Sequence, residues 1–217
     1  MNRKTKVDSK KKGRSSFIIL VLLFLLGLIV GGAYCLYHEF FQTDSNQVIV
    51  VSKIDDYGYY LNSNTTKLYQ KYYKQLENEL KDSKIDEESY VTLLSQLFTI
   101  DFYTLSNKLT NRDIGGIQFV SSSLQERFKE EASNSIYKYV RNNTGKNRQQ
   151  TLPEVVKSTV LDVEEEEYSH KDFKDSNGFQ TTVELEYKED LGYPKTLKLF
   201  FIHEENKLVL VEIEEQK

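Results

Sequence analysis

Three hydrophobic patterns follow one another along this chain. An uninterrupted apolar run covers 17–37, and apolar residues then recur at intervals near four between residues 64 and 140. After Pro153 the interval falls to two. Intervals near four are typical of helices with one buried face, whereas intervals of two are typical of strands. The patterns therefore predict a membrane-spanning segment, then a helical region, then a β-stranded region.

The apolar run is long enough to cross a bilayer. It contains 21 residues without a charge, which at helical rise span roughly 30 Å, the thickness of the hydrocarbon core. Residues 1–16 contain seven Lys and Arg residues against one Asp. The positive-inside rule keeps such a basic tail in the cytoplasm. We therefore expect a single-pass cell-membrane protein with a lipid-embedded helix at 17–37, a short spacer at 38–46 and an exported domain at 47–217.

Two alternatives make the same run a cleaved segment. A secretory signal has an apolar core of about 7–15 residues and a small-residue cleavage site; Gly31, Gly32 and Ala33 supply small residues, but the run is longer. A lipoprotein signal would be cut before Cys35, yet Tyr34 stands where a small residue is expected. An uncleaved anchor is the favoured interpretation.

Small side chains recur every four residues within the apolar run, at Gly27, Gly31 and Cys35. This spacing lets two membrane helices approach closely, which would pair two copies of the chain as a homodimer. Glycine is also common in unpaired membrane helices, and this is the simpler interpretation. Cys35 is the only cysteine, so the sequence predicts an exported domain without an internal disulfide.

Charge divides the chain in the same way. The net charge is −4 in total and +6 over residues 1–16, which leaves −10 for 17–217. An acidic exported domain argues against binding to nucleic acid, which requires a basic face. Frequent Lys, Asn, Glu and Tyr with no Trp is typical of an AT-rich Gram-positive bacterium.

The exported part has the element order of an α+β domain, with about three helices followed by about four antiparallel strands. Asp86 is the expected N-cap of the second helix, and Ser121–Ser123 are the expected caps of the third. The predicted elements are a hairpin or extended segment over 48–61, helices over 65–82, 87–109 and 124–140, and strands over 155–163, 179–188, 196–203 and 207–214.

This order, with helices first and then a curved meander of four strands over 46–214, resembles the nuclear transport factor 2-like (cystatin-like) fold. The whole plan of basic tail, membrane helix and exported domain is similar to the inner-membrane assembly factors of type IV secretion and conjugation channels. The resemblance implies a cone-shaped domain that contacts other envelope proteins. It is carried by element order and not by a motif, so it transfers no functional residue.

Candidate chemistry is sparse. His170 follows Glu164–Glu167, and His203 precedes Glu204 and Glu205. A histidine beside carboxylates can act as a general base or bind a metal, and four glutamates can bind Ca²⁺. Successive strand residues point to opposite faces, however, which favours a solvated run of glutamates. No zinc-site or nucleophile motif accompanies the histidines, so we expect neither an enzyme nor a cofactor.

Tyrosine is the remaining signal, with fifteen in the chain and six within seventeen residues. Such a cluster either packs the first helix onto the sheet or forms a partner surface, since tyrosine is enriched at interfaces. The six are Tyr57, Tyr59, Tyr60, Tyr69, Tyr72 and Tyr73.

The sequence thus predicts a membrane-anchored, non-enzymatic domain that binds or scaffolds envelope proteins. A ligand- or cell-wall-binding sensor is the first alternative. An enzyme on the same fold is the second, and it would require a pocket in which His170 or His203 meets a carboxylate.

Overall fold

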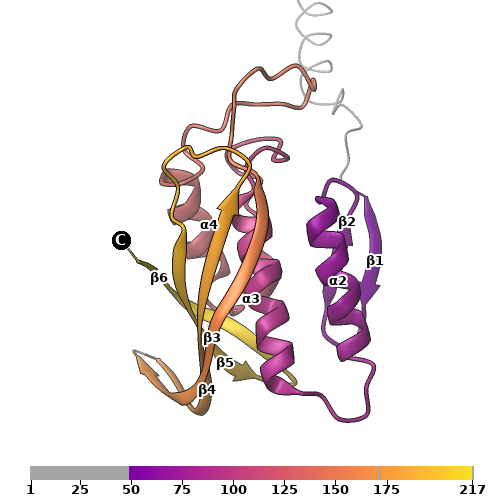
Figure 1. Cartoon of the computed structure of the whole chain (residues 1–217), viewed down its shortest axis with the longest axis vertical. Helices are drawn as coiled ribbons and strands as arrows, with labels where there is room; N and C mark the ends of the chain where they lie inside the picture. The colour runs from indigo at the N-terminus through magenta and orange to yellow at the C-terminus, as the bar shows by residue number, and fades with distance from the viewer. Residues whose placement is uncertain (1–48, 171, 217) are drawn as a thin grey trace, which may run out of the picture. The chain divides into compact units, whose positions relative to one another are not determined.

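Two antiparallel sheets and three α-helices make up the part of the chain that the computed structural model describes, residues 49–170 and 172–216 (Figure 1). The predicted α+β class is confirmed. The elements are, in order, β1 (Val50–Ile54), β2 (Tyr59–Asn62), α2 (Lys67–Glu79), α3 (Glu87–Tyr103), the 3-10 helix η1 (Ile117–Phe119), α4 (Gln125–Asn134), β3 (Val155–His170), β4 (Phe173–Tyr187), β5 (Thr196–Glu204) and β6 (Lys207–Gln216).

The predicted tail, anchor and spacer lie outside the described residues, as do the pairing residues Gly27, Gly31 and Cys35. Within 49–170 and 172–216, no helix is both long enough and apolar enough to cross a membrane.

Strands β3 to β6 form one antiparallel sheet in sequence order, and β1 and β2 form a separate hairpin. The first two strands of the meander are longer than their hydrophobic alternation predicts, because β3 has 16 residues and β4 has 15. Glu164–Glu167 continue β3 with exposed side chains; Glu164–Glu166 stand opposite residues 178–180 of β4, and Glu167 lies in a register shift. A strand ladder needs only backbone groups, so alternation of side chains under-reports its length.

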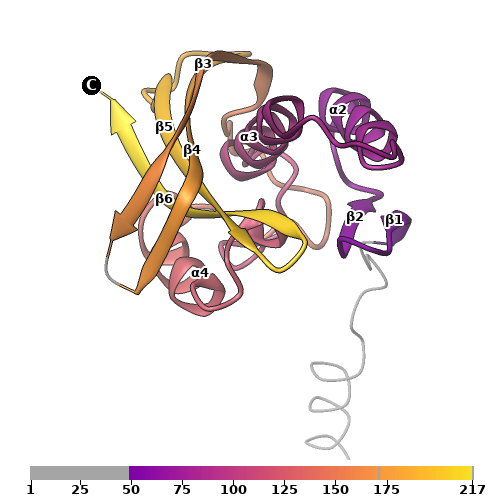
Figure 2. The ribbon, with the colours of Figure 1, turned by 90° about the horizontal axis from the view of Figure 1, so that it is seen from below.

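Helix α3 occupies the centre of the domain, with the four-stranded sheet on one side and α2 with the β1–β2 hairpin on the other (Figures 1 and 2). Eleven of its seventeen residues are buried. A helix that is apolar on most sides is typical of such a central position. The expectation that the first helix packs onto the sheet is therefore wrong, since α2 packs on α3 instead.

The N-cap predicted for α3 is correct, whereas the caps predicted for α4 are wrong. Asp86 caps α3 as expected, and its carboxylate accepts hydrogen bonds from the backbone N–H groups of Glu88 and Ser89. In contrast, α4 begins at Gln125 without a side-chain cap and ends at Asn134, before the predicted end at 140. The hydroxyls of Ser121 and Ser122 donate to the carboxylate of Glu204 instead, at 2.7 and 2.8 Å.

Candidate functional site

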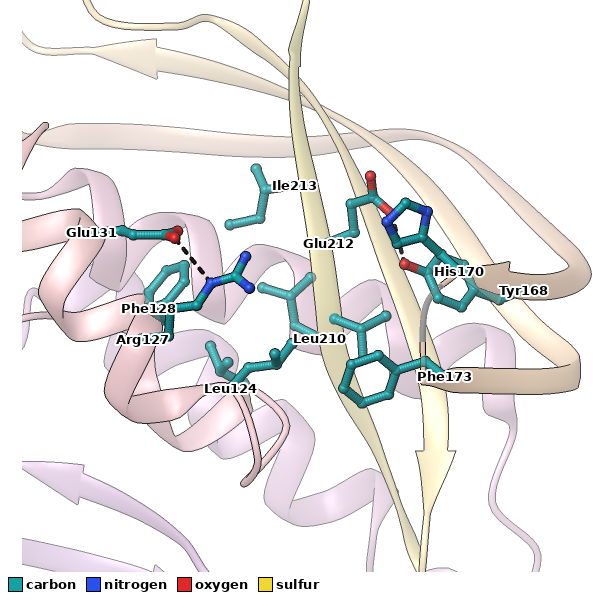
Figure 3. Close-up of a pocket in the computed structure, with 12 residues that line it drawn as sticks. Leu124, Arg127, Phe128, Glu131, Tyr168, His170, Phe173, Leu210, Glu212 and Ile213 are labelled. Atoms are coloured by element: carbon teal, nitrogen blue, oxygen red, sulfur yellow. Dashed lines mark hydrogen bonds and ion pairs between the residues drawn. The ribbon is translucent and has the colours of Figure 1, made fainter.

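A groove of about 280 Å³ lies between α4, strand β6 and the tip of the β3–β4 hairpin (Figure 3). Arg127 extends from α4 into this groove, and Tyr168 and His170 face it from the hairpin. The residues that line the groove are Val120, Leu124, Arg127, Phe128, Glu131, Tyr168, His170, Phe173, Leu210, Val211, Glu212 and Ile213.

The groove lies where two apolar clusters meet. Along β5, Phe201 belongs to the main core and its neighbour Phe200 packs against a smaller cluster. Because successive strand residues point to opposite faces, the two clusters occupy opposite faces of the sheet. Leu124 and Phe128 of the α4 wall are half-buried and pack against the main core, whereas Phe173 at the hairpin tip packs against the smaller cluster. The groove therefore follows the edge of the sheet.

A local irregularity in β3 and β4 brings the hairpin tip to this edge. The register of the two strands shifts between Glu166 and Tyr168, opposite Gly178. A β-carbon on Gly178 would lie only 3.0 Å from the carbonyl oxygen of Phe201 and 3.2 Å from Cβ of Tyr168. A bulge bends the strand, and glycine permits the close approach of backbones at the bend. Tyr168 can then pack over β5 and β6.

The polar groups of the groove are only partly engaged with one another. The Nε of Arg127 donates to Glu131 at 2.9 Å, but no hydrogen bond from the described residues reaches its two Nη atoms. The hydroxyl of Tyr168 donates to Glu212 at 2.6 Å. Burial, and then this carboxylate, raise the pKa of Tyr168, so the phenol stays protonated. The Arg127 fork suits a carboxylate or carbonyl oxygen, and Glu212 suits a cation.

His203 forms a separate cluster outside the groove, and its partners are not the expected Glu204 and Glu205. Its Nδ1 lies 2.7 Å from Asp175 on β4, and its Nε2 lies 3.4 Å from Glu87 in the first turn of α3. The backbone N–H of His203 also donates to Asp175, at 2.7 Å. The cluster thus links α3 to the hairpin. No group of side chains suited to hold a metal occurs within the described ranges, the four glutamates of β3 included.

A third polar cluster surrounds the predicted turn at Asp113–Gly116. Buried Lys108 pairs with Asp101 at 2.5 Å, and the other carboxylate oxygen of Asp101 accepts the N–H of Gly116. Gly116 has a φ of 75°, a conformation that favours glycine. Asp101 thus ties this turn to the end of α3, and Lys108 neutralises its charge.

The tyrosine cluster divides into two halves. Tyr59, Tyr69 and Tyr73 are at most 2% exposed, so they belong to the core and are unavailable as a free surface. They pack α2 and the β1–β2 hairpin together, and the hydroxyl of Tyr73 donates to the carbonyl of Tyr59 at 3.0 Å. Tyr57, Tyr60 and Tyr72 are half-buried around them.

Sequence patterns found part of the groove. Leu124 and Phe128 fall within the helix predicted over 124–140, and in the structure both pack against the main core and line the groove. Nothing in the sequence indicated Arg127, Phe173 or Glu212, because these residues converge from three separate elements.

Comparison of the chain with protein-family models, with curated proteins and with solved structures returns no match.

Proposed function

We propose that this chain is a membrane-anchored binding or scaffolding protein whose exported domain holds a segment of another envelope protein in the groove between α4 and the β3–β4 tip. The apolar run at 17–37 and its basic flank support the anchor and its orientation. The resemblance in plan to type IV secretion and conjugation assembly factors supports an envelope partner.

The observation that carries this proposal is the composition of the groove. Apolar side chains come from both walls, including Phe128 on α4 and Phe173 on the hairpin, and they offer hydrophobic contact to a bound segment. Arg127 and Glu212 add charges of opposite sign on the two sides (Figure 3). Apolar walls with a few polar groups are typical of binding sites.

A small-ligand or cell-wall sensor is the second candidate. The free Nη atoms of Arg127 favour an anionic group, and the exposed imidazole of His170 stands at the same groove. If the groove binds only a small ligand, no other protein contacts it, so one cross-linking experiment separates the two functions.

The test is photo-cross-linking in intact cells that express the full chain. A photoreactive phenylalanine analogue replaces Phe173 in the groove, and a matched control carries it at Leu161, which is 56% exposed on β3 outside the groove. We expect an adduct with one other envelope protein from position 173 and none from position 161. Equal labelling at both positions, or no protein adduct at 173 under efficient photolysis, would refute a protein partner in the groove.

A further inference from the structure

The edge of strand β6 forms the floor of the groove. Four consecutive residues, Leu210–Ile213, line it. Successive side chains of a strand point to opposite faces, so a surface over one face would contact only alternate residues. Alternation is interrupted at Val211, where the register of β6 shifts by one residue, but Leu210 and Ile213 pack with the main core and Val211 packs with the smaller cluster on the other face. Contact with residues from both faces shows that the groove follows the backbone edge, with α4 on one side and the hairpin tip on the other (Figure 3).

The first position on this edge is already used for strand pairing. Val120 forms an isolated parallel bridge with Leu210, and the carbonyl of Leu210 accepts the N–H of Ser121 at 2.9 Å. The chain then turns away into α4, which begins at Gln125. The segment at Val120 therefore pairs with β6 through a single bridge and does not continue as a strand.

The positions beyond Leu210 keep their backbone groups directed outward. In an antiparallel pair, residues that bond to the neighbouring strand alternate with residues whose N–H and C=O face away. The C=O of Leu210 bonds to Ser121, so the backbone groups of Leu210, which stands opposite Phe201, face away from β5. The alternation continues regularly along β5, where Leu199 is two residues from Phe201 and stands opposite Ile213. Ile213 and then Glu215 therefore also direct N–H and C=O away from β5. No hydrogen bond from the described residues reaches these outward groups.

The side chains on the two sides of this edge differ in chemistry. Toward α4 the edge faces Leu124 and Phe128, with the Arg127–Glu131 ion pair beside them, and Ile213 packs in the same cluster as the two apolar residues. On the opposite face of β6 stand Glu212 and the exposed Glu214. An added strand would therefore present apolar side chains toward α4 and basic side chains toward the hairpin tip.

We propose that the groove binds an extended segment of a partner protein as an additional β-strand on β6, with apolar and basic residues in alternation. This inference rests on the binding function proposed above and specifies how the segment is held. Exposed strand edges are usually blunted by charge. Here Glu212 and Glu214 restrict the edge to segments of complementary charge, while backbone pairing supplies affinity.

The test uses the full chain in detergent micelles and a nine-residue peptide in which lysine and valine alternate. Two further peptides carry N-methyl groups on all valines or on all lysines, which blocks one edge of the strand at a time. We expect the parent peptide to bind, one methylated peptide to bind at least tenfold more weakly and the other to bind like the parent. Hydrogen exchange should show new protection of the backbone N–H groups of Ile213 and Glu215. The N–H of Glu214 should change little, because it already faces β5.

A pair of protein variants tests the same edge. Glu215→Pro removes an outward N–H, which edge strands tolerate, and Glu215→Ala removes the same side chain but keeps the donor. We expect Glu215→Pro to bind the parent peptide at least tenfold more weakly than Glu215→Ala. If Glu215→Pro does not fold, the methylated peptides and hydrogen exchange decide alone.

Several results would overturn strand pairing. One is equal binding of all three peptides with no protection at Ile213 and Glu215, which would mean that side chains alone hold the peptide. Another is no binding of the parent peptide. A third is a wild-type dimer in light scattering that Glu215→Pro converts to a monomer, because a second copy would then occupy the edge. The photo-cross-linking experiment at position 173 tests the proposed binding function independently of strand pairing.

Discussion

The phenolic oxygens of Tyr59 and Tyr90 lie 2.6 Å apart in the core, where they join β2 to α3. The Tyr59 hydroxyl also lies 3.4 Å from the carbonyl oxygen of Leu208 on β6. Burial raises the pKa of both phenols well above its usual value, so both are neutral and can share hydrogen bonds. This contact connects the hairpin, the central helix and the sheet.

Removing either hydroxyl should destabilise the domain. We expect Tyr59→Phe and Tyr90→Phe each to lower the free energy of unfolding by about 1 kcal/mol, the typical net value of a buried hydrogen bond. The double variant should lose less than the sum, because both substitutions break the same bond. Chemical denaturation followed by circular dichroism measures this, with exposed Tyr139→Phe as a control near zero. Strict additivity would contradict a shared bond.

Hydroxyls also pair across the interface between α3 and the sheet. Ser95 Oγ lies 2.8 Å from Thr181 Oγ1, and both side chains are fully buried. Thr181→Val alone should have a small effect, because Ser95 still donates to the carbonyl of Val91 at 2.8 Å.

Ser95→Ala alone should cost about 1–3 kcal/mol, because it leaves the buried hydroxyl of Thr181 without this partner. Combining Ser95→Ala with Thr181→Val should recover much of that loss, because neither partner then remains unpaired. Thermal denaturation of the four proteins tests the order. A double variant that is less stable than Ser95→Ala would contradict the explanation.

The turn after α3 has no room for a side chain at Gly115. An added β-carbon would overlap the backbone carbonyl of Asp101 and lie 2.7 Å from Nζ of Lys108. We expect Gly115→Ala to destabilise the domain by about 2 kcal/mol or more, the range of an overpacked core position. Gly145→Ala is the matched control, since its nearest neighbour would be an unstrained 3.6 Å away. Equal unfolding midpoints for the two variants would refute the close approach.

His203 should make stability depend on pH. Partial burial lowers its pKa, but hydrogen bonds and attraction from Asp175 and Glu87 outweigh burial and raise the pKa above 6.5. A raised pKa in the folded state stabilises below the unfolded pKa, and this contribution is lost as pH rises through the folded value.

The stability of the wild type relative to His203→Gln should therefore fall between about pH 6 and pH 9, by less than about 1 kcal/mol because the ring is partly exposed. Denaturation curves at both pH values measure the difference. His170→Gln is the control, since no hydrogen bond from the described residues engages that ring. A wild-type advantage that grows with pH would contradict this assignment.

Local patterns predicted the elements better than their packing. Asp86 could be identified as a cap because a capping bond joins residues close in sequence. Ser121 and Ser122 look equally like caps, yet they bind Glu204, more than 80 residues away. Tyr59 and Tyr73 stand in a sequence cluster typical of either a core or an interface, and only the burial of their rings shows that they belong to the core.

The sequence by itself determined the α+β class, the order of helices and strands and the cap of α3, because each depends on periodicity or on contacts within a few residues. Only the tertiary structure decided that α3 separates α2 from the sheet, that His203 meets Asp175 and Glu87, and that Arg127, Phe173 and Glu212 share one groove. These relationships join distant parts of the chain. The groove also depends on the bend at Gly178 and on the exposed edge of β6, neither of which has a local hydrophobic signal.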